Sequence, residues 1–234
     1  LTFPRRWLCE RVARNIAVTN HVAMRISLPR TLTIYHGTPD SGVRPANDLA
    51  DNGSELQIGF VGRLVQEKGL PVLLQAAKQL DESGVAFHLT FVGDGPERAK
   101  LRGLSTELGL DRRITFKGDL RGADLGDALR AIQVVVMPTE SEETAGLAAI
   151  EQMMAGGAVI VADIGGLSEV VGDAGLKFPS GNADALASCI RQVLRKPVLA
   201  SALGSAARSR AVQIFSRDGM IRAHVSVYQD HVLR

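Results

Sequence analysis

The sequence lacks the features that mark several protein classes. Only two of its 234 residues are cysteine, Cys9 and Cys189, which are too few for a disulfide scaffold. His and Cys form no cluster with zinc spacing, and no apolar run approaches the roughly 18 residues of a membrane span. With 27 Lys and Arg against 25 Asp and Glu, the net charge of +2 gives no reason to expect a nucleic-acid partner. Hydrophobic residues make up 45% of the sequence, which is enough for a core, so the class that these exclusions leave is a globular protein.

The order of apolar segments predicts an α/β fold. Short apolar runs typical of buried strands alternate with longer segments that repeat apolar residues at helical spacing. The strands are expected at 56–61, 87–92, 113–116, 134–137, 158–162 and 176–178, and the helices at 68–81, 96–108, 123–132, 147–154, 183–194 and 198–215. Such alternation predicts a doubly wound parallel sheet with helices on both faces, a Rossmann-like domain.

The N-terminal part is expected to depend on other segments for its stability. Residues 37–54 are rich in Gly, Pro, Asp, Asn and Ser and are typical of a linker. Before them we expect the end of a helix at 7–12, a strand at 15–19, a short helix and a strand at 31–35. These elements are too few for a core of their own. They must therefore pack on the rest of the chain or on another domain.

A candidate phosphate site follows the first strand of the predicted sheet. Gly62 and Arg63 come directly after it, and Lys68 and Gly69 precede the next helix. Ligands of open parallel sheets bind beyond the carboxyl ends of the strands, where helix N-termini present free N–H groups. Two cations at such a point suit a phosphate or diphosphate. The alternative is an ordinary turn with solvated charges.

An acidic segment follows the fourth strand. Glu143 is expected in the loop and Glu151 two turns into the next helix, which should start at Gly146. Carboxylates accept strong hydrogen bonds from sugar or ribose hydroxyls. A glycosidase pair is disfavoured because eight helical residues span about 12 Å, which is more than the distance between the two carboxylates of a glycosidase. For the neighbouring Glu140 and Glu142, capping of the helix is the competing interpretation.

The remaining loops carry weaker signals. Asp94 is typical of a plain strand-to-helix turn, and the backbone at Lys117 and Gly118 lines the same edge of the sheet. The turn Gly165-Gly166 leads to Glu169, for which a capping role and a supporting role beside the site are both open. Of the five histidines, only His36 lies where a cleft is expected, and a structural role is favoured for it as for His88; Cys189 is expected in a helix core.

Together these loops resemble the C-terminal domain of a retaining glycosyltransferase of family 4 (glycosyltransferase group 1, GT-B fold). The resemblance covers roughly residues 55–200. Six motifs carry it, each after an expected strand: Phe-Val-Gly62-Arg63 with Lys68-Gly69, Phe-Val-Gly93-Asp-Gly-Pro96, Ile-Thr-Phe-Lys-Gly118, Met137-Pro138-Thr, Glu143-x7-Glu151 and Gly165-Gly-Leu-Ser-Glu169.

The resemblance implies a role for each matching residue. Arg63 and Lys68 would hold the diphosphate of a nucleotide-sugar donor, next to Gly62. Glu143 and the amides of Thr144, Ala145, Gly146 and Leu147 would face the sugar and the distal phosphate. Glu151 would accept hydrogen bonds from the ribose hydroxyls, and the backbone near Lys117 and Gly118 would hold the base.

The implied chemistry is transfer of a hexose-type sugar with retention, without a metal or other cofactor and through a same-face ion pair. The family's usual Glu-Gly-Phe-Gly reads Glu143-Thr-Ala-Gly146 here, which leaves the sugar open. The acceptor, a glycan, lipid or small molecule, is also open. Two other readings are a nucleotide-sugar binding module without catalysis and a related epimerase; a phosphorylase would need a lysine placed for pyridoxal phosphate.

By the same resemblance, residues 1–36 are a remnant of an N-terminal acceptor domain, and residues 201–234 are helices that would cross back to it. The chain alone is then expected to bind a nucleotide without transferring sugar. Apolar surface at 16–18, at 32–34 and near Met220, Ile221 and Val225 would favour a homodimer through these terminal segments. The expected location is the cytoplasm, including the inner face of a membrane.

Overall fold

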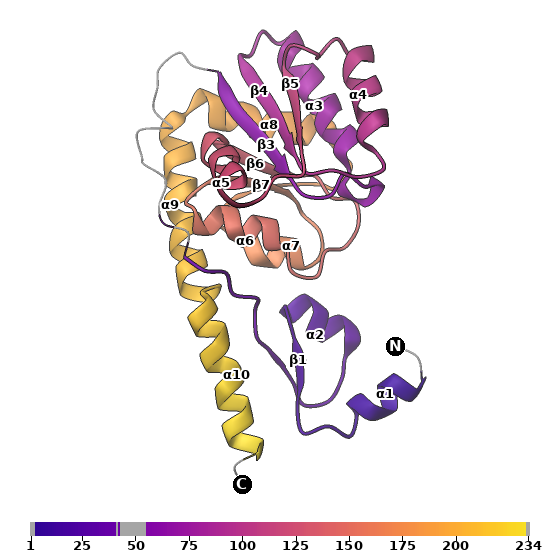
Figure 1. Cartoon of the computed structure of the whole chain (residues 1–234), viewed down its shortest axis with the longest axis vertical. Helices are drawn as coiled ribbons and strands as arrows, with labels where there is room; N and C mark the ends of the chain where they lie inside the picture. The colour runs from indigo at the N-terminus through magenta and orange to yellow at the C-terminus, as the bar shows by residue number, and fades with distance from the viewer. Residues whose placement is uncertain (1–2, 41, 43–54, 233–234) are drawn as a thin grey trace.

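The computed structural model describes residues 3–40, 42 and 55–232. These residues form an elongated molecule (Figure 1). A sheet flanked by helices occupies one end, and the N-terminal segment lies beside the C-terminal helix at the other.

The main sheet is the predicted parallel one. Its strands are β3 (Leu56–Val61), β4 (Phe87–Val92), β5 (Ile114–Gly118), β6 (Val134–Met137), β7 (Ala158–Ala162) and β8 (Leu176–Phe178). All neighbours pair in parallel in the order β5-β4-β3-β6-β7-β8. The order reverses between β3 and β6, so this point is the topological switch of a doubly wound fold, where ligands of such sheets bind.

Helices cover both faces of this sheet, as the sequence predicts. They are α3 (Leu70–Glu82), α4 (Arg98–Glu107), α5 (Gly122–Ala131), α6 (Leu147–Met154), α7 (Gly165–Val171), α8 (Ala183–Arg195) and α9 (Pro197–Ile214). Val134 and Val136 of β6 join the core cluster under α3, α4 and α8, whereas Val135 and Met137 join the cluster under α5, α6, α7 and α9. Successive side chains of a strand point to opposite faces, so both faces of β6 are buried.

The N-terminal segment contains α1 (Phe3–Cys9), β1 (Asn15–Ala17), α2 (Asn20–Ile26) and β2 (Thr31–Thr33). The two strands pair in parallel and form a separate sheet. The strand expected at 15–19 ends at Ala17 because Thr19 is the N-cap of α2, and the helix expected to end at residue 12 ends at Cys9.

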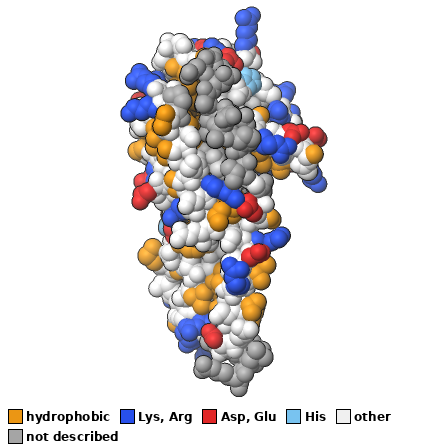
Figure 2. Space-filling model, turned by 90° about the vertical axis from the view of Figure 1, so that its left-hand side faces the viewer, with side chains coloured by type: hydrophobic (Ala, Val, Ile, Leu, Met, Phe, Trp, Pro, Cys, Tyr) orange, Lys and Arg blue, Asp and Glu red, His pale blue; other side chains and the backbone are white. Residues whose placement is uncertain are grey.

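The expected exposure of apolar terminal residues is confirmed in part. Ile16, Ile221 and Val225 are 39%, 48% and 44% exposed. Ala17 and Ile34 are each only 6% exposed, so the expectation is wrong for these two residues. Figure 2 shows hydrophobic side chains in small groups among charged ones on the face that carries α9 and the final helix, α10 (Arg217–Val232).

The C-terminal helices contact the segment that leaves the N-terminal sheet. The Thr38 amide donates to the Phe215 carbonyl at 2.9 Å, and the Arg217 amide donates to the Thr38 carbonyl at 3.0 Å. The rings of Tyr35 and Phe215 pack edge to face, with their centroids 5.4 Å apart. Of the predicted linker at 37–54, residues 41 and 43–54 lie outside the described residues. No helix in the described part of the chain is long and apolar enough to cross a membrane.

Candidate functional site

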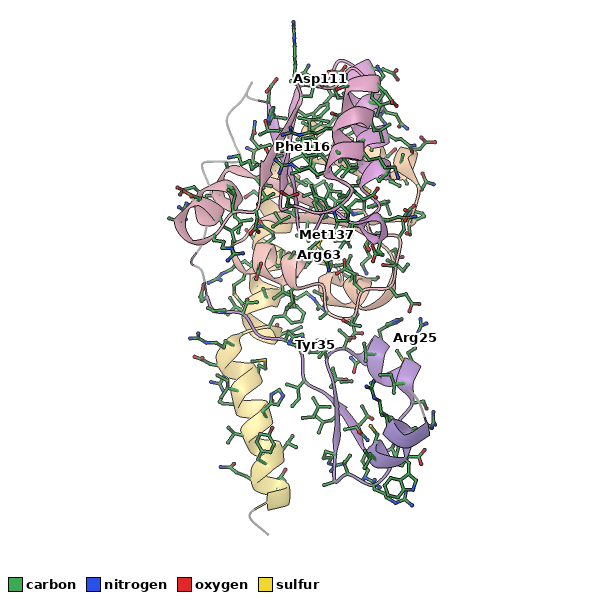
Figure 3. All side chains as sticks on the ribbon, turned by 45° about the vertical axis from the view of Figure 1, so that its right-hand side comes forward. Arg25, Tyr35, Arg63, Asp111, Phe116 and Met137 are labelled. Atoms are coloured by element: carbon green, nitrogen blue, oxygen red, sulfur yellow. The ribbon has the colours of Figure 1, made fainter. Side chains whose placement is uncertain are left out.

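A cavity of about 520 Å³ opens at the carboxyl ends of β3 and β6. Its walls include Gly62, Arg63 and Lys68 from the loop after β3, together with residues 141–148 from the loop after β6 and the start of α6. In Figure 3, Asp111, just before β5, lies at the far end of the sheet, whereas Arg63 and Met137 lie at the end that faces Tyr35 and Arg25. The cavity therefore occupies the topological switch point.

Arg63 and Lys68 bring two positive charges to this cavity. A short 3-10 helix, Gln66–Lys68, ends at Gly69, whose φ of 61° is left-handed. A Cβ on Gly69 would stand 2.0 Å from the Pro138 carbonyl oxygen, so glycine allows the loops after β3 and β6 to touch. Arg63 is exposed, and its side chain makes no hydrogen bond or ion pair with another described residue, so its guanidinium is available to an anion.

Lys68 is already paired with a carboxylate of the cavity. Its Nζ lies 2.5 Å from Oε1 of Glu143, and the two side chains are only 26% and 14% exposed. Partial burial makes such a pair stronger than a surface ion pair. The contact fixes the ammonium group inside the cavity, next to the carboxylate expected to face a sugar.

The N-terminus of α6 also faces the cavity. Gly146 is the N-cap residue with a left-handed φ of 56°, as expected for the start of this helix. The first-turn N–H groups of a helix have no partner within the helix and attract anions. A Cβ on Gly146 would stand 2.8 Å from Cδ1 of Leu167, so this turn is closely packed against α7.

Glu151 lines a second hollow of about 320 Å³, whose walls come from α5, α6, Thr38, Pro39 and Gly42. The sequence placed it two turns into the helix; because α6 begins at Leu147, it lies one turn in. Residues four apart share a helix face at about 5–6 Å, so Glu151 lies one turn after Leu147 on the same face of α6, but it does not line the cavity that holds Arg63. Burial raises the pKa of the Glu151 carboxyl.

Lys117 and Gly118 lie further along the same edge, at the carboxyl end of β5. They do not line the cavity that holds Arg63. The Gly93 amide donates to the Gly118 carbonyl at 2.7 Å, and the Gly62 amide donates to the Val92 carbonyl at 3.0 Å. The loops after β3, β4 and β5 thus form one continuous edge.

Several lesser sequence interpretations are settled by contacts. Glu142 forms an ion pair with Arg25, and α6 has no side-chain cap hydrogen bond. Asp94 accepts from the Gly95 amide at 2.7 Å, as expected of a turn residue. Cys189 is buried in α8, and His88 lies 2.9 Å from the Thr115 hydroxyl, which fits the structural role expected of it.

Glu169 is a capping residue, but not for its own helix. Its carboxylate accepts hydrogen bonds from the Asn20 and His21 amides at the start of α2. Sequence reasoning missed Tyr35, whose hydroxyl also donates to Glu169, and Thr19, whose hydroxyl donates to the Thr144 carbonyl. The pattern of a threonine just before a short helix was the available signal for Thr19; nothing local marks Tyr35.

The fold and the cavity are those of a doubly wound α/β protein that binds a ligand at its topological switch point. Comparison with known proteins identifies the family. Residues 46–210 match the model of the family described as glycosyl transferases group 1. Because the match covers more than half of the chain, the protein belongs to this family.

Curated relatives are longer than this chain. It is 37% identical over 142 residues to a 2-deoxystreptamine glucosyltransferase of Streptomyces kanamyceticus, a match that covers 60% of this chain and 36% of that protein. It is 30% identical over 177 residues to an uncharacterized glycosyltransferase of Methanocaldococcus jannaschii, covering 75% and 45%. The chain therefore matches about a third to a half of the length of these relatives.

Solved structures share the arrangement. Sucrose-phosphate synthase from Thermosynechococcus elongatus aligns with a TM-score of 0.82 at 27% identity, covering 97% of this chain and 60% of that one. HepE from Anabaena, solved with UDP and glucose, aligns with a TM-score of 0.82 at 23% identity and covers 95% and 64%, which shows a shared fold.

Proposed function

We propose that this chain binds the nucleoside diphosphate sugar in a retaining glycosyltransferase of family 4, which transfers a hexose-type sugar to an acceptor. The observation that carries the proposal is the cavity at the switch point, where Arg63, Lys68 and the N-terminus of α6 converge. These groups are two cations and a set of backbone donors. A diphosphate is the ligand that such a set matches best.

The same groups would lower the barrier to transfer. Cleavage of the bond between the sugar and the phosphate leaves negative charge on the departing diphosphate. Arg63 and Lys68 stand where that charge develops, so they would stabilise the transition state without a metal ion. Glu143, which pairs with Lys68, would orient a sugar hydroxyl.

The nucleoside would extend along α6 from the diphosphate. Glu151 lies one turn beyond Leu147 on the same face and would accept hydrogen bonds from the ribose hydroxyls. The backbone at Lys117 and Gly118 would contact the base. No residue of the cavity is proposed as a covalent nucleophile, so retention would follow from attack on the same face as departure.

Titration calorimetry of UDP, GDP and ADP in the presence of EDTA tests the proposal. We expect at least one of them to bind, and Arg63→Ala to weaken that binding by about 1.5–3 kcal/mol, the contribution of a hydrogen bond to a charged group. Binding that disappears in EDTA and returns with Mg²⁺ would contradict the metal-independent site. Failure of all three to bind with or without Mg²⁺ would refute the proposal as a whole.

A further inference from the structure

The loop that carries Glu143 is enclosed by two helices from different parts of the chain. We call residues 142–146 the donor loop. From α7, the Gly166 amide donates to the Glu143 carbonyl at 2.8 Å. From the start of α2, the Thr19 hydroxyl donates to the Thr144 carbonyl at 2.9 Å, and Thr19 is fully buried.

The α2 helix also holds the donor loop on the other side of Glu143. Arg25 forms an ion pair with the Glu142 carboxylate, and His21 Nε2 lies 3.6 Å from the same carboxylate. Glu143 therefore lies between two points, Glu142 and Thr144, that are both attached to α2. Its position depends on where α2 is.

Glu169 of α7 fixes α2 in place. Its Oε1 accepts from the Asn20 amide at 2.8 Å and its Oε2 from the His21 amide at 2.7 Å. The Tyr35 hydroxyl donates to Oε1 at 2.6 Å. Arg210 donates to the Glu169 carbonyl at 2.9 Å, so the main chain that carries this carboxylate is held as well.

Three hydrogen-bond donors surround the Glu169 carboxylate, and they favour its ionised form, which has acceptors only. Burial raises its pKa, but the hydrogen bonds from Tyr35, His21 and Asn20 together outweigh burial and lower it. Hydrogen bonds to an ionised acceptor are roughly twice as strong as neutral ones. Thus the contact between α2 and α7 depends on one charged group.

We propose that Glu169 is a positioning residue for the donor loop: by capping α2 it holds Glu143 and the amides of residues 144–146 against the sugar and the distal phosphate. This inference rests on the proposed function and adds a residue that does not line the cavity. Through Glu169, the N-terminal segment becomes part of the donor site although it contributes no side chain to the cavity walls.

Glu169→Gln is the informative change because it keeps the size of the side chain. A glutamine amide has one acceptor oxygen, and its NH₂ group would face a donor of α2. One helix amide then loses its partner, and α2 loosens its hold on the donor loop. Lys117, Gly118 and Glu151 lie on β5 and α6, so contacts to the nucleoside are unchanged.

The first measurement is hydrogen exchange of the unliganded protein. In Glu169→Gln, the Gly166 amide, which donates to the Glu143 carbonyl of the donor loop, should exchange faster, while the amides of β4 and β7 keep their protection. Glu82→Gln, which alters an exposed ion pair with Lys78 on α3, serves as the matched control and should exchange like the original chain. Unchanged exchange of the Gly166 amide, or an equal increase in exchange across the whole sheet, would overturn the proposal.

The second measurement is the affinity for the tightest binder among UDP, GDP and ADP and for its nucleoside. Glu169→Gln should weaken the diphosphate by roughly five- to tenfold, within the range of coupling between separate sites, and leave the nucleoside unchanged. Tyr35→Phe, which removes one donor and keeps the ring on Phe215, should give a smaller loss of the same kind. Equal losses for nucleoside and diphosphate would overturn the proposal. If the original chain binds none of the three nucleotides, the proposed function fails. The hydrogen-exchange result then tests by itself whether Glu169 holds the donor loop in place.

Discussion

The ion pair between Lys68 and Glu143 gives a quantitative test of the cavity. Lys68→Met removes the ammonium group and keeps most of the aliphatic side chain. A hydrogen bond to a charged group contributes about 1.5–3 kcal/mol. At about 1.4 kcal/mol per factor of ten, the dissociation constant of the bound nucleoside diphosphate should rise roughly 10- to 150-fold.

The loss has a second component, because Glu143 then faces the diphosphate without its partner. Its side chain is only 14% exposed, so solvent screens the repulsion poorly. The double variant Lys68→Met with Glu143→Gln should therefore bind the diphosphate more tightly than Lys68→Met alone. Together with the single variant Glu143→Gln, these proteins form a double-mutant cycle that isolates the coupling between the two residues.

Titration calorimetry in EDTA measures these affinities. Lys78→Met is the matched control, because Lys78 forms an exposed pair with Glu82 outside the cavity. We expect this control to bind like the original chain. A dissociation constant for Lys68→Met within twofold of the original would refute the assignment of the diphosphate to this cavity.

Three further predictions concern other parts of the site. Gly146→Ala and the control Gly84→Ala both place a side chain at a left-handed φ, at a cost of roughly 1–2 kcal/mol. Only Gly146→Ala should weaken diphosphate binding in calorimetry, because only there would the Cβ contact a neighbour, Leu167, and equal binding by both variants would contradict this. Burial raises the pKa of Glu151, so the stability it costs appears as the pH rises through that pKa; urea unfolding should show Glu151→Gln to be more stable than the original chain at neutral pH and equal to it in acid. The lowered pKa of Glu169 acts in the opposite sense: its contribution to stability is present above the unfolded-state pKa and lost as the pH falls through the folded-state pKa. Glu169→Gln should accordingly be less stable near neutrality, and a gap that persisted in strong acid would count against the charged contact.

The strands and their order along the chain were predictable because the signal is local. Runs such as Val134–Met137 are apolar on both faces, and the structure buries both faces under helices. Helix ends were less predictable, because they depend on caps and turns. The helix expected from Pro96 begins at Arg98, and the strand expected to start at residue 113 extends to Gly118.

The candidate site was predictable only as a set of loops at one edge. That Arg63, Lys68 and Glu143 come together follows from the parallel topology, which places the carboxyl ends of the strands side by side. The particular pairing of Lys68 with Glu143 joins residues 75 positions apart and has no local signal. The contact of Glu169 with α2 spans 148 and 149 positions, so only the fold shows it.

The most direct test of the account is a crystal structure of the chain with the nucleoside diphosphate that binds it. We predict that diphosphate oxygens lie within hydrogen-bond distance of the Arg63 guanidinium, the Lys68 ammonium and the amides at the start of α6, with the ribose hydroxyls on Glu151. A nucleotide bound elsewhere, or in this cavity with its phosphates directed away from Arg63 and Lys68, would contradict the central claim.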